Sequence, residues 1–437
     1  MKVYAFVPAK SSSERVYNKN TQFLSGERLF VRALRTLLKC KEIDEVFLDT
    51  DSKEMYEMVD YLPVKFMQRD KSLASNKTDG HQLLVNEVTA FPEADIYVQL
   101  LCTSPFILPS TIDEMIRKIK NSNYDSGVLM KKEKCYFWNN KYPEYNINHI
   151  PNSKDLPDTI TESMGLYIAK KDLVLKEKKR YGGNILLHFG FPQELVDINS
   201  PQDLSFAKTI ADGLLREENN FLRRIKPVLT SAACSDVIDN FNNATGELCG
   251  GVISGWKSNL MHKSILGRAN TLKLRALKKD ENPVGIYSAL TSYEGIKEND
   301  IIIVENELKD FAYFGSLNAH LAIAAGAVGA IIDGATRDCE ETQFLDFPVF
   351  AKKYTAKDVR NRATVDYINK PILIEKFIIS PGDLLFVDSG GLVVIYPKYE
   401  KEIIGKVLEV YHNEKGIISD ITANQSITEI LSKRGCF

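Results

Sequence analysis

The chain has 437 residues, of which 44% are hydrophobic and 26% charged, and its formal net charge is -2. These values are typical of globular proteins, and the absence of excess positive charge argues against nucleic-acid binding. We therefore expect small molecules or other subunits as partners. At roughly 150 residues per domain, the length predicts two or three domains, each with its own core.

The cysteines and the apolar runs narrow the class of protein further. The seven cysteines are scattered and include no CxxC pair, which predicts neither a disulfide framework nor a zinc site. The longest apolar stretch begins at Ala319, is broken by glycine and Asp333, and is interpreted as a buried helix leading into a buried strand. The N-terminus runs straight into a strand pattern, so we expect a cytoplasmic protein without a membrane segment.

Residues 1–211 alternate short β-branched runs with amphipathic stretches. The strand patterns are VYAFVPA, EVFLDT, IYVQLL and SGVLMK, and helical patterns such as GERLFVRALRTLLKC and STIDEMIRKIKN lie between them. This alternation predicts parallel βαβ units in a doubly wound, Rossmann-like α/β domain. Such sheets bind ligands at the carboxyl ends of their strands. The loop after the first strand would meet the segments LDTD and CTSP there.

A charged helical pattern over residues 212–227 is expected to link two domains. Residues 228–437 then contain more alanine and glycine, with strand patterns at NDIIIVEN, GAIIDG, GDLLFVDSGG and LVVIYP, and predict a second α/β domain. One continuous large domain is the alternative, and the length makes it the less favoured one.

The loop PAKSSSERVYNKN, residues 8–20, leaves the first strand with small residues and three cations, Lys10, Arg15 and Lys19. Backbone N–H groups and fixed cations suit a nucleoside triphosphate, because negative charge accumulates on the phosphate oxygens during attack at phosphorus. Three solvated surface cations are the simpler reading of this loop taken alone.

The loop resembles the N-terminal signature of the CMP-sugar synthetases, the cytidylyltransferases that activate sialic acid and 3-deoxy-manno-octulosonate. Further matches follow in order at LDTD (48–51), RDKSLASNKTDG (69–80), CTSPF (102–106), DLPDTITESMGLYI (155–168) and VDINSPQDL (196–204). The resemblance implies transfer of CMP from CTP to a 2-keto sugar acid, with release of pyrophosphate, in surface-glycan biosynthesis.

The same resemblance implies roles for individual residues. Mg²⁺, or another divalent cation such as Mn²⁺, would bind Asp197 together with phosphate oxygens. The sugar side would be lined by Gln99, Thr103, Glu162 and Tyr167. The nucleotide would be held by Pro8, Ala9, Lys10, Ser11, Ser12, Ser13, Arg15, Lys19, Arg69, Ser75, Thr78 and Asp79, with Lys10, Arg15 and Lys19 gripping the triphosphate.

Several positions depart from the pattern or allow a structural reading. Lys10 replaces the usual arginine, Leu101 the usual glutamine, and Asn199 a second acidic metal ligand. These changes leave the acceptor open, and a phosphorylated polyol or a phosphonate is the alternative to a sugar acid. Asp51 is expected to cap the helix that follows it rather than meet a metal. His81 is expected to be structural, since this transfer needs no strong base.

In the second half, Arg337 and Asp338 follow the apolar strand GAIIDGAT, where a simple salt bridge is the default reading. The surrounding residues 314–352 resemble the core of the family that includes RraA (regulator of ribonuclease activity A) and the class II 4-hydroxy-4-methyl-2-oxoglutarate aldolases. SDVIDN (235–240), ENDIIIVEN (298–306) and SPGDLLFVDSGGLVVIYP (380–397) also match. The resemblance implies an RraA-like fold for this half.

In the aldolase branch of that family, the resemblance implies that Arg337 binds a pyruvyl or other 2-oxo acid and that Asp338 holds a divalent metal. The metal would stabilise an enolate as a carbon–carbon bond breaks or forms. Backbone amides at Gly315, Ser316 and Leu317 would line the carboxylate pocket, although Ser316 replaces a usual glycine. The family implies a homotrimer or homohexamer built through this domain. A non-catalytic oligomerisation or regulatory module is the alternative.

Overall fold

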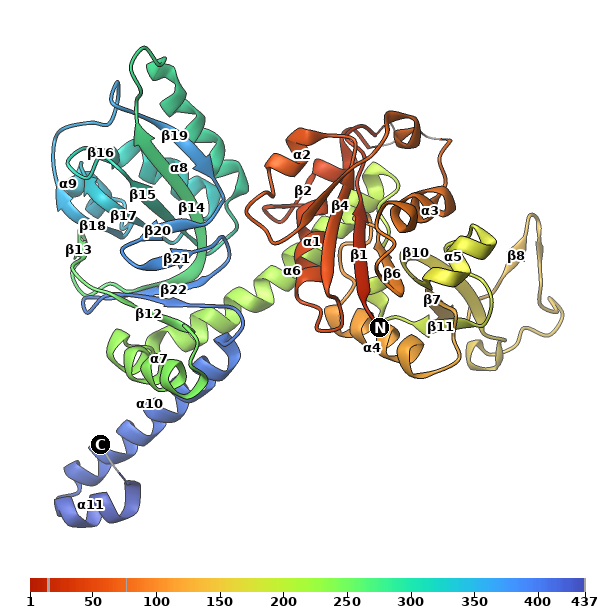
Figure 1. Cartoon of the computed structure of the whole chain (residues 1–437). Helices are drawn as coiled ribbons and strands as arrows, with labels where there is room; N and C mark the ends of the chain where they lie inside the picture. The colour runs from red at the N-terminus through yellow and green to blue at the C-terminus, as the bar shows by residue number, and fades with distance from the viewer. Residues whose placement is uncertain (14–15, 76, 436–437) are drawn as a thin grey trace. The chain divides into compact units, whose positions relative to one another are not determined.

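The strand β1 (Val3–Pro8) lies in the interior of the first sheet, and five of its six residues are buried. The computed structural model describes residues 1–13, 16–75 and 77–435 (Figure 1). The chain divides into two units, Met1–Gly213 and Leu214–Phe437, and each is described by itself. Polar loops leave β1 and its neighbours at their carboxyl ends, and these loops carry the first candidate site.

The first unit contains a seven-stranded sheet in the order β11-β7-β10-β6-β1-β4-β5. The neighbours β6, β1, β4 and β5 are parallel, whereas β10 runs antiparallel to both β6 and β7. Leu166, within β10, therefore lies beside Leu100 at the carboxyl end of β6. The remaining bounds are β4 (Glu45–Thr50), β5 (Lys65–Gln68), β6 (Ile96–Leu100), β7 (Ser126–Glu133), β10 (Thr159–Lys170) and β11 (Ile185–Phe189).

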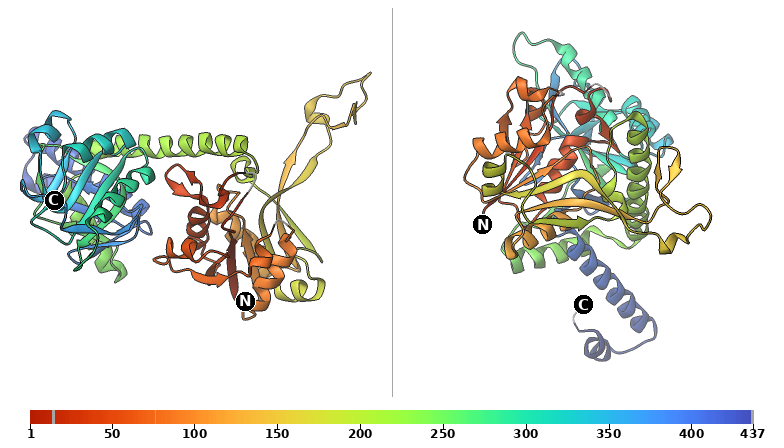
Figure 2. Two further views of the ribbon diagram at one scale, coloured as in Figure 1. Left: turned by 90° about the horizontal axis from the view of Figure 1, so that it is seen from above. Right: turned by 90° about the vertical axis from the view of Figure 1, so that its right-hand side faces the viewer.

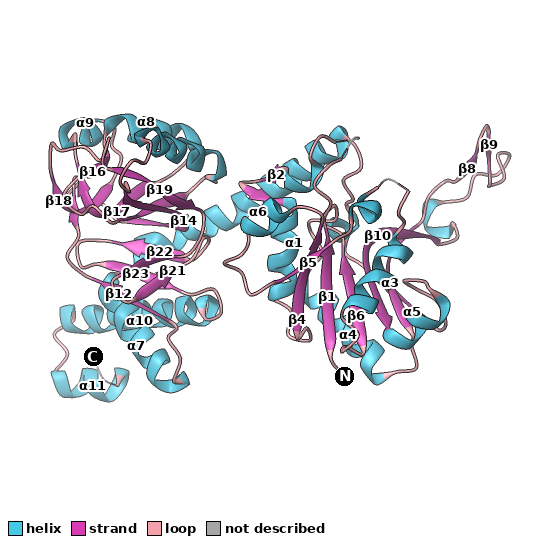
Figure 3. Ribbon diagram, turned by 45° about the horizontal axis from the view of Figure 1, so that its top comes forward, coloured by secondary structure: helices cyan, strands magenta, loops and turns pink. Residues whose placement is uncertain are grey.

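Helices cover both faces of this sheet, which confirms the predicted doubly wound α/β class (Figure 3). Val3, Ala5 and Val7 share one apolar core, while Tyr4 and Phe6 belong to another, because successive side chains of a strand point to opposite faces. The helices are α1 (Leu29–Leu38), α2 (Lys53–Glu57), α3 (Gly80–Ala90), α4 (Pro109–Asn121), α5 (Lys171–Glu177) and the beginning of α6 (Pro201–Ile225).

Two short hairpins are added to the first unit. One pairs β2 (Phe23–Leu24) with β3 (Glu27–Arg28). The other pairs β8 (Trp138–Asn139) with β9 (Tyr142–Pro143), and Figure 2 shows it standing away from the sheet.

The helix α6 runs without interruption from Pro201 to Ile225 and contains the division between the two units. It begins eleven residues before the helix expected at 212–227. Leu204 and Ala207 pack in the first core, whereas Leu222 and Ile225 pack in a core of the second unit. The apolar residues at the start of α6 therefore belong to the first unit, and only its later turns serve the second.

The second unit is built on a ten-stranded sheet with the path β12-β23-β22-β14-β15-β17-β18-β13. The neighbours β14, β15, β17 and β18 are parallel. Two further strands join it at β17 and β14. The bounds are β12 (Gly250–Ile253), β13 (Lys257–Ser258), β14 (Ile265–Ala276), β15 (Asp300–Asn306), β16 (Ala312–Phe314), β17 (Gly329–Thr336), β18 (Val349–Tyr354), β19 (Ala363–Ile368), β22 (Leu384–Val387) and β23 (Leu392–Ile395).

Helices and a separate hairpin complete the second unit and enclose three apolar cores. The hairpin joins β20 (Ile372–Ile374) to β21 (Phe377–Ile379). The helices are α7 (Ser231–Thr245), the 3₁₀ helix η6 (Pro283–Gly295), α8 (Ser316–Ala325), α9 (Cys339–Phe344), α10 (Glu400–Thr422) and α11 (Ile427–Arg434).

The apolar stretch from Ala319 behaves only partly as predicted. Every residue of β17 is buried, as expected, but in α8 only Ala319 and Ala322 are. Leu317, Leu321 and Ile323 of α8 are exposed. The prediction of a buried helix is therefore wrong, because the small residues of α8 face the sheet and the large ones face outward.

The six cysteines within the described ranges form no disulfide. No helix in the described part of the chain is long and apolar enough to cross a bilayer.

Candidate functional sites

The loop after β1 is fixed to the neighbouring strand by Asp51. Ser11 donates twice to this carboxylate, from its backbone N (2.8 Å) and from Oγ (2.6 Å). Burial opposes ionisation of Asp51, but the two Ser11 hydrogen bonds outweigh it and lower the pKa. The expectation that Asp51 caps α2 is wrong, because the Ser52 side chain accepts the N–H of Met55 instead. These two hydrogen bonds anchor the start of the loop at Ser11.

Two buried side chains close the loop onto other segments. Asn20 donates to the backbone oxygen of Lys10 at 2.8 Å and accepts from the thiol of Cys102 in the loop after β6. The ammonium of Lys19 donates to the carbonyl of Ile198 at 2.7 Å. The loops that follow β1 and β6 and the segment before α6 are therefore joined at one edge of the sheet. Of the predicted triphosphate ligands, Arg15 lies outside the described residues.

The predicted metal ligand Asp197 lies next to that junction. Asn199, the residue that replaces a second acid, donates from Nδ2 to Oδ2 of Asp197 at 2.5 Å. The other oxygen, Oδ1, is buried and has no hydrogen-bond partner. No cluster of three or more His, Cys, Asp or Glu side chains suited to a metal occurs in the described ranges. Asp197 therefore offers one carboxylate oxygen, and substrate phosphates would have to supply further ligands.

Arg69, predicted to contact the nucleotide, is buried in an ion pair with Asp49. It donates from Nε to Oδ1 (2.9 Å) and from Nη2 to Oδ2 (2.6 Å), and the two side chains are 3% and 0% exposed. Gln99, predicted on the sugar side, is buried and donates to Glu87 at 2.8 Å. Burial, and then the charge of Asp49, raise the pKa of Glu87 well above its usual value. Sequence reasoning gave no role to Asp49, which lies within LDTD, or to Glu87, which lies in no motif.

The segment that contains Ser75, Thr78 and Asp79 lies nearer to solvent. The hydroxyls of Ser75 and Thr78 are 3.2 Å apart. Asp79 caps α3 by accepting the N–H of Gln82, whose side chain accepts the N–H of Asp79 in return. The capping box explains Asp79 in structural terms, while the nucleotide-binding role of Ser75 and Thr78 stays a prediction.

Glu162 and Tyr167 on β10 lie beside Arg180, a residue that no motif indicated. The Tyr167 hydroxyl donates to Oε1 of Glu162, and burial raises the pKa of this phenol. Nη2 of Arg180 lies 3.7 Å from Oε1 of Glu162, and the guanidinium lies over the Tyr167 ring at 3.5 Å from its centroid. Thr103 accepts the N–H of Ile198 through its carbonyl, which places it at the junction near Asp197.

In the second unit, Arg337 and Asp338 meet the turn before α8. Nη1 of Arg337 lies 2.6 Å from Oδ2 of Asp358, and its Nε lies 3.4 Å from Oδ2 of Asp338. That Asp338 oxygen accepts the backbone N–H of Ser316 at 3.1 Å. A Cβ at Gly315 would lie 2.4 Å from it. The structure therefore brings together the predicted residues of this site, with Leu317 exposed beside them.

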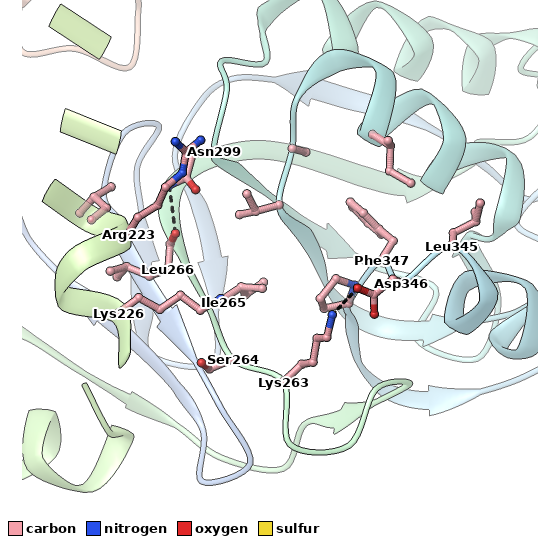
Figure 4. Close-up of a pocket in the computed structure, with 15 residues that line it drawn as sticks. Arg223, Lys226, Lys263, Ser264, Ile265, Leu266, Asn299, Leu345, Asp346 and Phe347 are labelled. Carbon is pink, nitrogen blue, oxygen red and sulfur yellow. Dashed lines mark hydrogen bonds and ion pairs between the residues drawn. The ribbon is translucent and has the colours of Figure 1, made fainter. Parts of the chain in front are cut away.

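A cavity of about 430 Å³ lies within the second unit (Figure 4). It is lined by residues that precede β14, β15, β17 and β18, so it opens at the amino ends of these parallel strands, whereas Arg337 and Asp338 follow the carboxyl end of β17. Lys263 pairs there with Asp346 at 2.5 Å. The cavity is therefore no part of the predicted 2-oxo-acid site.

Comparison with protein families assigns a separate family to each unit. Residues 4–178 match the family described as cytidylyltransferase, and residues 234–394 match the family described as aldolase/RraA. The chain joins a cytidylyltransferase unit to an RraA-like unit. Both predicted resemblances are therefore confirmed, and the two names are used below for the two units.

Individual relatives are distant. N-acylneuraminate cytidylyltransferase of Escherichia coli O18:K1:H7 is 21% identical over 334 residues, which cover 72% of this chain and 73% of that protein. The CMP-N,N'-diacetyllegionaminic acid synthase of Legionella pneumophila is 29% identical over 117 residues, covering 26% of this chain and 50% of that one. Protein DlpA of Legionella pneumophila is 26% identical over 200 residues, 46% of this chain, and the match spans only 31% of its length.

Proposed function

We propose that the cytidylyltransferase unit transfers CMP from CTP to a hydroxyl group of an acidic sugar of the ulosonate class and releases pyrophosphate. The observation that carries this proposal is the junction of three loops by Lys19, Asn20 and Thr103, with an unpartnered oxygen of Asp197 beside it. Two relatives named for N-acylneuraminate and diacetyllegionaminic acid support an acidic nine-carbon sugar as the acceptor.

The reaction needs positioning and charge stabilisation more than proton abstraction. The acceptor hydroxyl oxygen bonds to the α-phosphorus, the bond from that phosphorus to the bridging oxygen breaks, pyrophosphate leaves, and the hydroxyl proton passes to solvent. Lys10, Arg15 and Lys19 are assigned to the triphosphate, and the start of their loop is anchored by the hydrogen bonds of Ser11 to Asp51. Mg²⁺ would be held by Asp197 and would supply charge neutralisation at the phosphate oxygens.

Pyrophosphate release from CTP is the direct test. The full chain would be supplied with CTP, Mg²⁺ and a panel of acceptors that contains nonulosonic acids, an octulosonic acid, a phosphorylated polyol and a phosphonate. Release that depends on one of the sugar acids, with the corresponding CMP-sugar detected by mass spectrometry, is the expected result. Pyrophosphate release only with the polyol phosphate or the phosphonate would show that the acceptor is not a sugar acid. No release with any acceptor would overturn the proposed activity.

For the RraA-like unit we propose metal-dependent carbon–carbon lyase chemistry on a 2-oxo acid. The observation that favours it is the convergence of Arg337, Asp338 and the amide of Ser316, which would meet a carboxylate and a divalent cation on one side of β17. Asp358 shares the guanidinium of Arg337 and holds it at this edge. The large side chains of α8 are exposed, which supports the alternative that this unit serves oligomerisation, as a trimer or hexamer.

The two roles of the RraA-like unit are separated by Arg337→Met in the full chain. A lyase would lose pyruvate production from 2-oxo acid substrates with Mg²⁺ or Mn²⁺, while its oligomer size in analytical ultracentrifugation stayed the same. Arg224→Met, an exposed change on α6, is the matched control. If the wild-type chain produced no pyruvate from any tested 2-oxo acid, the lyase role would be overturned and the oligomerisation role would remain.

A further inference from the structure

Arg180 is a half-buried cation, and its side-chain donors have no hydrogen-bond partner in the described part of the chain. Its side chain is only 17% exposed, and Nε is buried without a partner. None of its five guanidinium N–H groups has a hydrogen-bond acceptor in the described part of the chain, since Glu162 approaches only to 3.7 Å. Arg69, by contrast, donates three hydrogen bonds to Asp49. A buried donor such as Nε is normally satisfied, so the missing partner of Nε points to an acceptor that comes from outside the protein.

The protein holds this guanidinium in a fixed place. The Tyr167 ring lies beneath it, and Tyr181 lies nearly parallel to Tyr167, with an interplanar angle of 14°. The backbone N–H of Arg180 donates to Nδ1 of His81 at 3.0 Å. Gly80 leaves room for the side chain, because a Cβ there would lie 2.0 Å from Nη1. Arg180 therefore has little freedom to turn toward another protein partner.

The nearby carboxylates are already engaged by other donors. Glu162 accepts the Tyr167 hydroxyl, and Asp79 accepts the N–H of Gln82 as the cap of α3. The charge of Arg180 contributes to the lowered pKa of Asp79, after the backbone hydrogen bonds of Gln82 and His81. Neither carboxylate accepts a hydrogen bond from the guanidinium. The planar fork is thus left for a ligand that presents two oxygens in one plane.

The position of Arg180 indicates which ligand this is. Tyr167 pairs in register with Gln99 on β6, and Gly80 directly follows Thr78 and Asp79, which are predicted to hold the nucleotide. Arg180 therefore lies between the segment assigned to the nucleotide and the strand assigned to the acceptor. We propose that Arg180 binds the carboxylate of the acceptor sugar acid. This inference rests on the proposed cytidylyl transfer and adds a residue that selects acidic acceptors over neutral sugars.

The test compares Arg180→Met and Arg180→Lys with the wild-type full chain by pyrophosphate release. Losing a charged hydrogen-bonded partner is worth about 1.5–3 kcal/mol, so Arg180→Met should raise the KM for the sugar acid roughly 10- to 150-fold and change the KM for CTP less than twofold. Lysine keeps the charge without the fork and should recover part of the loss. Arg117→Met, an exposed change on α4, is the matched control.

A second measurement separates recognition from a structural role. The methyl ester of the acceptor removes the negative charge without changing the reacting hydroxyl. The wild-type chain should prefer the acid over the ester by the same factor that Arg180→Met loses, and Arg180→Met should hardly distinguish them. A merely structural arginine would lower activity with both acceptors alike, and that outcome would overturn the inference, as would an equal rise in the KM for CTP.

The experiment distinguishes a failure of the role of Arg180 from a failure of the proposed cytidylyl transfer. If the wild-type chain turns over a sugar acid and the variants retain its full preference for acid over ester, only the role of Arg180 is overturned. If the wild-type chain releases no pyrophosphate with any acceptor, the transfer activity and the role of Arg180 both fall. Arg180→Lys, which fills the same space, keeps the test valid if the methionine variant is poorly folded.

Discussion

Arg69 and Asp49 form a buried ion pair joined by three hydrogen bonds, one of them to the Asp49 backbone carbonyl. The pair lies at the carboxyl edge of the first sheet, where a nucleotide-binding role for Arg69 is predicted. Arg69 is 3% exposed and Asp49 is fully buried, so both are desolvated in the folded chain. Removing one partner of such a pair leaves the other charge buried and unpaired.

We therefore expect Arg69→Met to destabilise the cytidylyltransferase unit by about 3–5 kcal/mol, because Asp49 would remain buried and unpaired. Hydrogen–deuterium exchange of the full chain, read from peptides that cover β4 and β5, would measure the loss locally. Arg117→Met should leave the same peptides unchanged. A variant as protected as the wild type, but with a raised KM for CTP, would instead assign Arg69 to nucleotide binding.

Removing the anchor of the phosphate loop should weaken CTP binding. Asp51→Ala deletes the acceptor of both Ser11 hydrogen bonds, and each is worth about 1.5–3 kcal/mol when its partner is charged. We expect a rise in the KM for CTP on the order of 10- to 100-fold, and a smaller rise for Ser11→Ala, which keeps the backbone N–H bond. Glu57→Ala, an exposed change on α2, is the control. Equal effects of Ser11→Ala and Glu57→Ala would contradict this account.

The Mg²⁺ requirement of cytidylyl transfer is expected to involve Asp197. Chelation with EDTA is expected to abolish pyrophosphate release, and added Mg²⁺ to restore it. Asp197→Asn replaces the unpartnered carboxylate oxygen with a neutral group, so the Mg²⁺ concentration for half-maximal activity should rise at least about tenfold. Asp172→Asn on α5 serves as the control. An unchanged Mg²⁺ dependence of Asp197→Asn would remove this residue from the metal site.

The stability of the RraA-like unit should fall as the pH rises from 4 to 7. Burial raises the pKa of Asp300 to about 7 from its ordinary value of 3.8. Between these values the unfolded chain is ionised while the native carboxyl stays protonated, so unfolding releases a proton. The loss levels off above pH 7 and amounts to at most about 4 kcal/mol.

The measurement of this pH dependence uses one of the two tryptophans. In a Trp138→Phe background only Trp256 of the RraA-like unit remains, and its fluorescence can follow urea unfolding of the full chain at several pH values. Asp300→Asn should flatten the profile between pH 4 and 7 and stabilise the unit at pH 8. A profile that is the same with and without Asp300 would show that another group titrates.

The order of strand and helix patterns in the first half predicts its fold class correctly. Continuous burial along β1 and amphipathic helices such as α4 leave few other ways to bury both faces of a sheet. The pattern does not predict that β10 runs antiparallel between β6 and β7, because the burial of a strand does not depend on its direction. For α8, composition misleads, since only the direction of each side chain decides which apolar residues are buried.

By itself, the sequence determined the two families, the loop of small residues and cations after β1, and the pairing of Arg337 with Asp338, because these features are contiguous in the chain. Only the tertiary structure decided which partner each side chain meets. It placed Asp51 on Ser11, Asp49 on Arg69, and Arg180 over Tyr167, residues that lie 40, 20 and 13 positions apart. The physical reason is that hydrogen bonds and ion pairs depend on distances in the folded chain, and periodicity along the sequence does not contain them.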